Sequence, residues 1–179
     1  MLFEKLTDSV SVRVTTAGKR TKFLKELVPT AGRIDKNDAP HCIDVIEALV
    51  RGGDVELARA EVERLSKIVG NNNRYHLILL RLQAVLAQWD GDLAQAIVHL
   101  QAALALAREM GLPGEEWPIL GALGGLYAEL GEEGKAQQAY QEAAVIIHRL
   151  AETIDEEDLR VGYLTAVCVQ SILEKSEGV

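Results

Sequence analysis

Aromatic side chains are scarce in this sequence, because phenylalanine, tryptophan and tyrosine make up only 4% of its 179 residues. Hydrophobic residues nevertheless account for 48% of the chain, and most of them are alanine, leucine or valine. Alanine and leucine are strong helix formers, and small core side chains let helices approach one another closely. The composition therefore favours a helical protein with a buried core.

Cysteine is scarce as well, and long apolar runs are absent. The two cysteines, Cys42 and Cys168, form no CxxC pair and exclude a disulfide framework. We expect both to be packed as small hydrophobic side chains. The longest apolar run, Ala102 to Ala107, is far shorter than a membrane span, and charged residues interrupt the first eight positions where a signal peptide would begin. These features predict a reducing, cytoplasmic setting.

Basic residues are fewer than acidic ones: the chain has 19 lysines and arginines but 27 aspartates and glutamates, which gives a net charge of −8. This balance argues against nucleic acid or an anionic membrane as the main partner. The deficit is uneven, because residues 1–38 hold 8 basic and 5 acidic side chains whereas the remainder hold 11 and 22. The N-terminal segment therefore differs in character from the rest.

Recognisable catalytic and metal-binding patterns are missing too. The glycines at 121, 124 and 125 follow no strand and precede no Lys-Ser/Thr pair, so they do not form a phosphate-binding loop. We expect no enzyme activity, no cofactor and no metal. No two histidines have the i, i+4 spacing of a helical metal site; they are His41, His76, His99 and His148.

What the sequence does contain is an internal repeat. Three times, a glycine is followed five residues later by an alanine, and apolar residues follow four and seven positions after that alanine. The three alanines, Ala58, Ala96 and Ala136, recur at nearly equal intervals of about 40 positions. Positions i, i+4 and i+7 share one helix face, and glycine favours the left-handed conformation that ends a helix. Each repeat therefore predicts a helix, a tight turn and a second helix, with Asp54 and Asp92 as N-caps.

The third repeat resembles the tetratricopeptide (TPR) consensus. Its matching residues are Leu123, Gly124, Tyr127, Gly131, Ala136, Tyr140 and Ala143. The second repeat matches at Ala84, Gly91, Ala96 and Ala103, and the first matches more weakly. The repeat is longer than the usual ~34 residues of the family, which implies about one extra turn in each helix. Over residues 39–165 the sequence is similar to the C-terminal TPR arms of MalT-like bacterial transcription activators and signalling NTPases.

These features predict an all-α fold, a TPR-like right-handed superhelix of three antiparallel helix pairs followed by a C-terminal capping helix. Residues 1–38 form a separate basic segment with a strand-like stretch at 9–14 and a basic amphipathic stretch at 19–28. The three pairs occupy residues 39–153, and the cap and tail occupy residues 154–179. Within these limits the expected helices are 40–51, 55–69, 74–89, 93–110, 115–130, 133–153 and 156–175.

The resemblance implies a protein-binding module that takes a peptide or helix in its groove, such as the regulatory arm of a signalling protein. A homo-oligomerisation or assembly scaffold is the alternative, with a homodimer as its simplest form. In the family, the first helix of each pair lines the groove. By that correspondence the partner-binding residues here are Glu47, Arg51, Arg81, Val85, Gln88, Trp89, Gly121, Gly125 and Glu129.

Two features among these positions decide the character of the groove. Trp89 either anchors a partner or packs under the turn that follows it. Gly121 and Gly125 predict a shallow trough suited to an apolar helix or extended segment, which residues 1–38 of this chain are also able to fill. The lysine and asparagine set by which some TPR proteins hold a carboxylate is missing.

Overall fold

The computed structural model describes residue 46 and residues 49–178, and it divides the chain into two units, residues 1–64 and 65–179. Helices are the only regular structure in this described part, so the predicted all-α class is confirmed there. The strand expected at 9–14, the basic stretch at 19–28 and Cys42 lie outside the described residues.

The first unit contains the turn of the first repeat. Ile46 and Leu49 are helical and buried, and the chain then turns at Gly53, whose φ is 83°. Helix α4 (Val55–Ile68) begins two residues later and continues into the second unit. The alanine of the repeat, Ala58, has no exposed surface, as its place in the pattern predicts.

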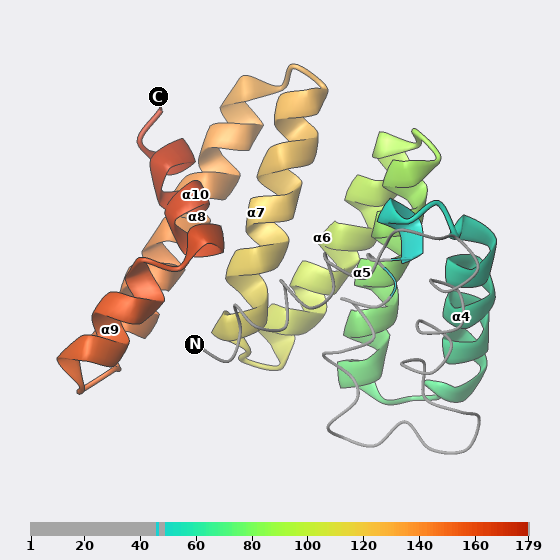
Figure 1. Ribbon diagram of the computed structural model, residues 1–179, viewed down its shortest axis with the longest axis horizontal. Coiled ribbons are helices and arrows are strands. Elements are labelled where there is room, and N and C mark those ends of the chain that lie inside the picture. The colour runs from blue at the N-terminus through green and yellow to red at the C-terminus, as the bar shows by residue number, and fades with distance from the viewer. Residues whose placement is uncertain (1–45, 47–48, 179) are drawn as a thin grey trace. The chain divides into compact units, whose positions relative to one another are not determined.

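The second unit holds six further helices, each packed on its neighbours. Contacts join α5 to α6, α6 to α7, and α7 to α8, while α9 and α10 both pack against α8 (Figure 1). The bounds expected for the first four of these helices agree with the structure to within two residues. The helices are α5 (Asn73–Trp89), α6 (Leu93–Glu109), α7 (Pro113–Glu129), α8 (Glu133–Glu152), α9 (Glu157–Leu164) and α10 (Val167–Ser176).

The length of the repeat follows from the length of these helices. Helices α5, α6 and α7 have 17 residues each, and connections of only three residues separate them from the helices that follow. The usual TPR repeat has about 34 residues, which two helices of this length would already fill without their connections. The extra length of the repeat therefore lies in the helices.

The same glycine turn closes each of these three helices. Gly91, Gly111 and Gly131 have φ angles of 78°, 63° and 74°, in the left-handed region that glycine enters without strain. At the third turn, the Gly131 amide donates to Ala128 O at 3.0 Å and the Glu132 amide donates to Tyr127 O at 2.8 Å. These two bonds form a Schellman motif, which satisfies the last carbonyls of the helix.

Replacing Gly131 with valine is expected to lower the free energy of unfolding by about 1–2 kcal/mol, because an L side chain is strained in the left-handed region. A Cβ atom at this position would have no atom within 4 Å, so the expected cost is backbone strain rather than a clash of the Cβ atom. The denaturant midpoint measures the effect. Gly134→Val is the matched control, because Gly134 also has open space but lies inside α8 with an ordinary helical φ. An equal loss in both variants would refute a special role for the turn.

Helices α5 and α6 each begin with a side-chain N-cap. The Asp92 carboxylate accepts a hydrogen bond from the Gln95 amide at 3.0 Å, as predicted for an N-cap. Asn72 does the same for α5, accepting from Arg74 and Tyr75. The boundaries of α5 and α6 are therefore encoded locally at both ends.

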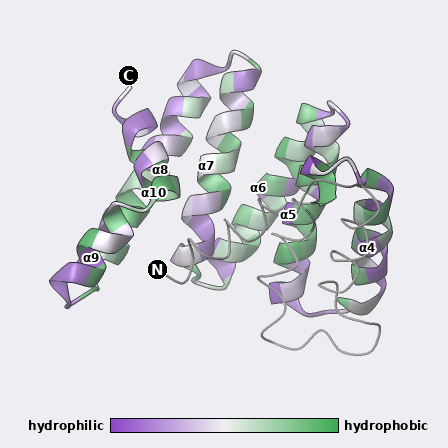
Figure 2. Cartoon of the chain, viewed as in Figure 1, coloured by the Kyte–Doolittle hydropathy of each residue, from purple (hydrophilic) through white to green (hydrophobic). Residues whose placement is uncertain are grey.

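The core of the second unit is built from small and aliphatic side chains. Ala96, Ala103 and Ala107 on α6 have no exposed surface. Figure 2 shows the hydrophobic residues concentrated on α5 and α6, whereas the start of α9 is hydrophilic. In the last pair, the Tyr140 ring of α8 lies against Gly124 of α7, where a Cβ atom would meet it at 2.7 Å. Glycine at 124 therefore lets the two helices pack around an aromatic ring.

The C-terminal region differs from the prediction. The single helix expected over 156–175 is two helices, α9 and α10, which are separated at Thr165 and Ala166. Cys168 lies on α10 and is exposed. Helix α10 instead buries Val169 and Ile172. The expectation that Cys168 is packed in the core was wrong.

Candidate protein-binding face

The candidate face begins with a stripe along α5. Arg81, Val85 and Trp89 are spaced four residues apart, so they lie in one row on the surface of the helix. Arg81 and Val85 are half-buried, and 52% of Trp89 is exposed. This exposed fraction favours the anchor interpretation of Trp89 over packing beneath the turn.

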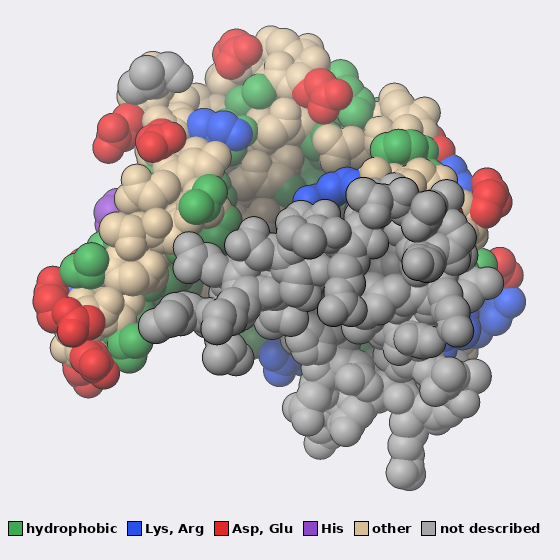
Figure 3. Space-filling view, in the orientation of Figure 1, with side chains coloured by type: hydrophobic (Ala, Val, Ile, Leu, Met, Phe, Trp, Pro, Cys, Tyr) green, Lys and Arg blue, Asp and Glu red, His purple; other side chains and the backbone are tan. Residues whose placement is uncertain are grey.

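A second stripe runs along α7 at corresponding positions of the next repeat. Its members, Gly121, Gly125 and Glu129, have the same four-residue spacing as the α5 stripe. At Gly125, the nearest atom to an added Cβ would be Tyr140 Oη at 3.8 Å, so this part of the helix surface is uncovered. Figure 3 shows the molecular surface hollowed over α7, beside α10.

An ion pair joins the two helices that carry these stripes. Arg81 Nη1 donates to Glu115 Oε2 at 2.7 Å, linking the middle of α5 to the first turn of α7. The two side chains are 21% and 36% exposed, so solvent screens the pair in part. Arg81 therefore already has a carboxylate contact within the chain, and its role as a partner-binding residue stays a prediction.

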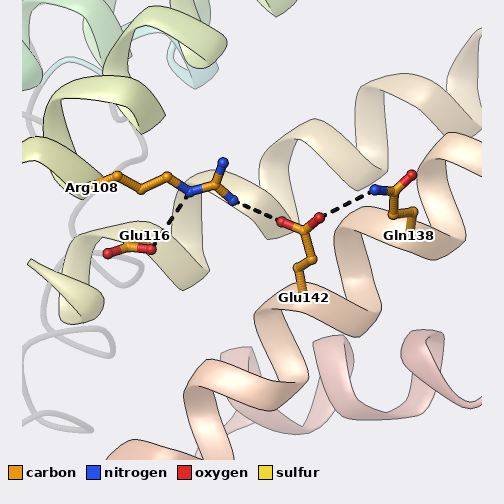
Figure 4. Close-up of polar contacts among 4 residues, drawn as sticks. All are labelled: Arg108, Glu116, Gln138 and Glu142. Carbon is orange, nitrogen blue, oxygen red and sulfur yellow. Dashed lines mark hydrogen bonds and ion pairs between the residues drawn. The ribbon is translucent and has the colours of Figure 1, made fainter.

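An analogous contact joins the second helices of the same two pairs. Arg108 on α6 donates through Nη2 to Glu142 Oε2 on α8 at 2.7 Å, and its Nε lies 3.8 Å from Glu116 Oε2 (Figure 4). Gln138 donates to the other oxygen of the Glu142 carboxylate at 3.3 Å. Arg81 and Arg108 each reach 34 residues along the chain, so each ion pair joins a helix to the next but one, α5 to α7 and α6 to α8.

The remaining predicted site residues do not all join this face. Gln88 is exposed near the end of α5, next to Trp89. Arg51 is exposed in the first unit, and Glu47 lies outside the described residues. Gly121 is covered by another part of the chain, because an added Cβ would lie 2.5 Å from Ile172 Cδ1 of α10. In the second unit, Gln88, Trp89 and Glu129 of the predicted face are exposed, and Val85 and Gly125 are half-buried.

Sequence reasoning missed two residues of this region, Glu115 and Ile172. Glu115 precedes the α7 stripe, and nothing in its local pattern indicates a contact with α5. Ile172 was expected in the capping helix, but its place over Gly121 depends on the break between α9 and α10. The spacing of Val169, Ile172 and Leu173, at i, i+3 and i+4, is the signal that indicates a separate buried face for α10.

The described residues include two partly buried titratable groups away from the α5 and α7 stripes. The same described residues contain no group of three histidine, cysteine or acidic side chains placed to hold a metal ion. Burial lowers the pKa of His99 on α6, which favours its neutral form at pH 7. Burial also raises the pKa of Tyr163 on α9. Neither group lies on the α5 or α7 stripe.

No helix among the described residues is long and apolar enough to cross a membrane. Comparisons with known proteins add no assignment: no protein-family model, no curated protein and no solved structure matches the chain significantly.

Proposed function

We propose that this chain is a protein-interaction module of the TPR type, and that it binds a peptide or helix of another protein. In this proposal the helix pairs stack as a right-handed superhelix, and the first helices, α5 and α7, line the groove. The regular repeat of helices and its recurring glycine turns support the stack. The resemblance to regulatory arms of bacterial signalling proteins supports a regulatory role.

The main support for the binding proposal is the exposure of Trp89. A tryptophan that leaves 52% of its surface exposed forgoes much of the stabilisation that burial would give it. Exposed aromatic side chains are enriched among the residues that dominate protein interfaces. Trp89 stands in the same row as half-buried Val85 and beside exposed Gln88, so an apolar anchor has polar neighbours around it.

The chemistry of the face indicates the kind of segment it would accept. Gly125 adds no side chain to the α7 surface, which permits close approach of a helix or an extended strand. Glu129 is exposed at the far end of the same stripe. The preferred partner segment therefore presents an apolar side chain toward Trp89 and a polar or basic one toward Glu129.

Replacing Trp89 with alanine is expected to weaken partner binding about thirtyfold, which corresponds to loss of ~2 kcal/mol at a buried anchor. The partner is first identified by affinity capture from the native host and mass spectrometry, and its affinity is then measured by calorimetry. The melting temperature should change little, because the side chain is already largely exposed. Val98→Ala is the matched control, since Val98 is 54% exposed but lies on α6, outside the stripes.

Tryptophan fluorescence provides an independent readout of the same contact. The chain has two tryptophans, Trp89 and Trp117, and Trp117 is partly buried against the core. In a Trp117→Phe variant, the emission of Trp89 should shift to the blue when the partner covers it. An unchanged emission spectrum at saturating partner, together with normal binding by Trp89→Ala, would remove Trp89 from the interface.

A further inference from the structure

Helix α10 lies on α7 and α8 much as a bound helical peptide would lie in a groove. Ile172 sits directly over Gly121, where the absence of a side chain leaves room for its Cδ1 and Cγ1 atoms. Helix α10 also packs along α8 (Figure 1). A residue of the candidate binding face is thus already covered by a helix of the same chain.

The surface under α10, here called the α10 seat, has three features that recognise a helix. Gly121 accepts an aliphatic side chain. The Tyr140 ring lies under the ammonium group of Lys175, which is 5.3 Å from the ring centroid. Gln137 Nε2 donates to the carbonyl oxygen of Ser176 at 2.6 Å, which satisfies a backbone acceptor at the end of the helix.

The sequence of α10 complements the α10 seat with a simple pattern. Val169 and Ile172 are 1% and 9% exposed, and Leu173 is partly buried beside them. These residues have the i, i+3, i+4 spacing by which amphipathic helices occupy hydrophobic grooves. Lys175 follows two residues after Leu173 and reaches Tyr140. The pattern is three apolar residues on one face followed by a cation.

Helix α10 is held less extensively than the helices beneath it. Two of its ten residues are buried, compared with seven of the twenty in α8. The preceding helix, α9, has no buried residue, and eight residues are too few for a stable isolated helix. The chain is also extended at Ala166, where φ is −60° and ψ is 134°. Elements with few buried contacts open at lower free energy than the core, so α10 is suited to separate from α7 and α8.

We propose that the α10 seat is a helix-binding site, that α10 is its resident occupant, and that a partner helix with the same pattern displaces α10. This inference rests on the proposed function in one respect, namely that a partner binds this side of the chain. It adds the sequence pattern of the partner helix and a means of regulation, because the seat is closed until α10 leaves it. A partner that carries the pattern has to compete with α10, which lowers its apparent affinity by the fraction of open molecules.

A peptide with the sequence of residues 166–178 tests the proposal directly. Ile172→Asp in the full-length protein should unseat its own α10 while leaving the seat intact, since residue 172 belongs to α10 alone. The fluorescein-labelled peptide should then bind Ile172→Asp at least tenfold more tightly than it binds the unaltered protein. Val167→Asp is the matched control, because Val167 is 87% exposed on the same helix and its substitution leaves α10 in place. A labelled peptide that itself carries Ile172→Asp should not bind any of these proteins.

The results separate this inference from the proposed function. Equal peptide affinity for Ile172→Asp and Val167→Asp, or no binding to either, would overturn the inference and leave the Trp89 experiment unaffected. If Ile172→Asp does not fold, hydrogen exchange of the unaltered protein decides instead. Amides of α10 should then exchange at least tenfold faster than those of α8. Equal exchange rates would mean that α10 opens only with the whole unit, which contradicts a displaceable helix.

Discussion

Replacing Ile147 with alanine is expected to lower the free energy of unfolding by about 2–5 kcal/mol. Ile147 lies on α8 and has no exposed surface, and it belongs to the core shared by the helices of the second unit. Truncation to alanine removes three carbons from this core and leaves a cavity that the neighbouring helices fill only in part. Equilibrium denaturation followed by circular dichroism gives the change, provided that the denaturant dependence of unfolding is the same in both proteins.

Val145 supplies the control for this prediction. It lies two residues earlier on the same helix, but 57% of its surface is exposed. Val145→Ala should change the free energy of unfolding by no more than ~0.5 kcal/mol, because alanine is a better helix former and little apolar surface is lost. Similar losses at 145 and 147 would mean that α8 does not bury the face carrying Ile147 and expose the face carrying Val145.

Much of the helical architecture of the second unit was predictable because its signals are local. The glycine at each turn and the alanine five residues later together specify where one helix ends and which face of the next is buried. Gly91 and Ala96 illustrate this, since the first has a φ of 78° and the second has no exposed surface. Asp92 then fixes the first turn of α6 through its bond to Gln95. The end of one helix, the N-cap of the next and the position of its buried alanine are therefore specified by residues close together in the sequence.

The split between α9 and α10 was not predictable in the same way. No glycine or proline interrupts residues 163–168, so the local pattern favours one continuous helix. In the structure, the Thr165 hydroxyl donates back to Val161 O at 2.7 Å, and Gln170 donates to Leu164 O at 2.9 Å. These side chains satisfy carbonyls at the end of α9 and let α10 take a different direction. The burial of Ile172 over Gly121 favours that direction, and it involves two residues that are distant in the sequence.

The candidate face was predictable as a row of positions but not in its surroundings. The resemblance to the TPR family assigned Val85, Trp89 and Gly125 to the groove, and the four-residue spacing places Val85 and Trp89 in one row on α5. The exposure of Trp89 depends on which side chains pack around the end of α5, and the spacing does not specify these side chains. The same limit applies to Arg81, whose partner Glu115 is 34 residues away. Contacts between non-adjacent helices had to come from the structure.

Two adjacent glycines on α7, Gly124 and Gly125, should respond oppositely to replacement by alanine. A Cβ atom on Gly124 would lie 2.7–2.9 Å from three ring carbons of Tyr140, and that ring is 6% exposed. Gly124→Ala should therefore lower the free energy of unfolding by about 1–3 kcal/mol through overpacking, even after the gain in helix propensity. Gly125→Ala meets only Tyr140 Oη at 3.8 Å, so it should raise the free energy of unfolding by up to about 1 kcal/mol.

The opposite signs are the informative part of this pair. Helix propensity alone predicts that alanine stabilises both positions equally, because both glycines lie inside the same 17-residue helix. A loss at 124 beside a gain at 125 requires that α8 packs more closely against position 124 than against position 125. Tyr140→Leu offers the further check, because a smaller side chain should reduce the cost of Gly124→Ala while leaving the effect of Gly125→Ala unchanged. Stabilisation by alanine at both positions would show that α7 and α8 do not pack closely at Gly124, and the match to the TPR consensus there would lose its physical basis.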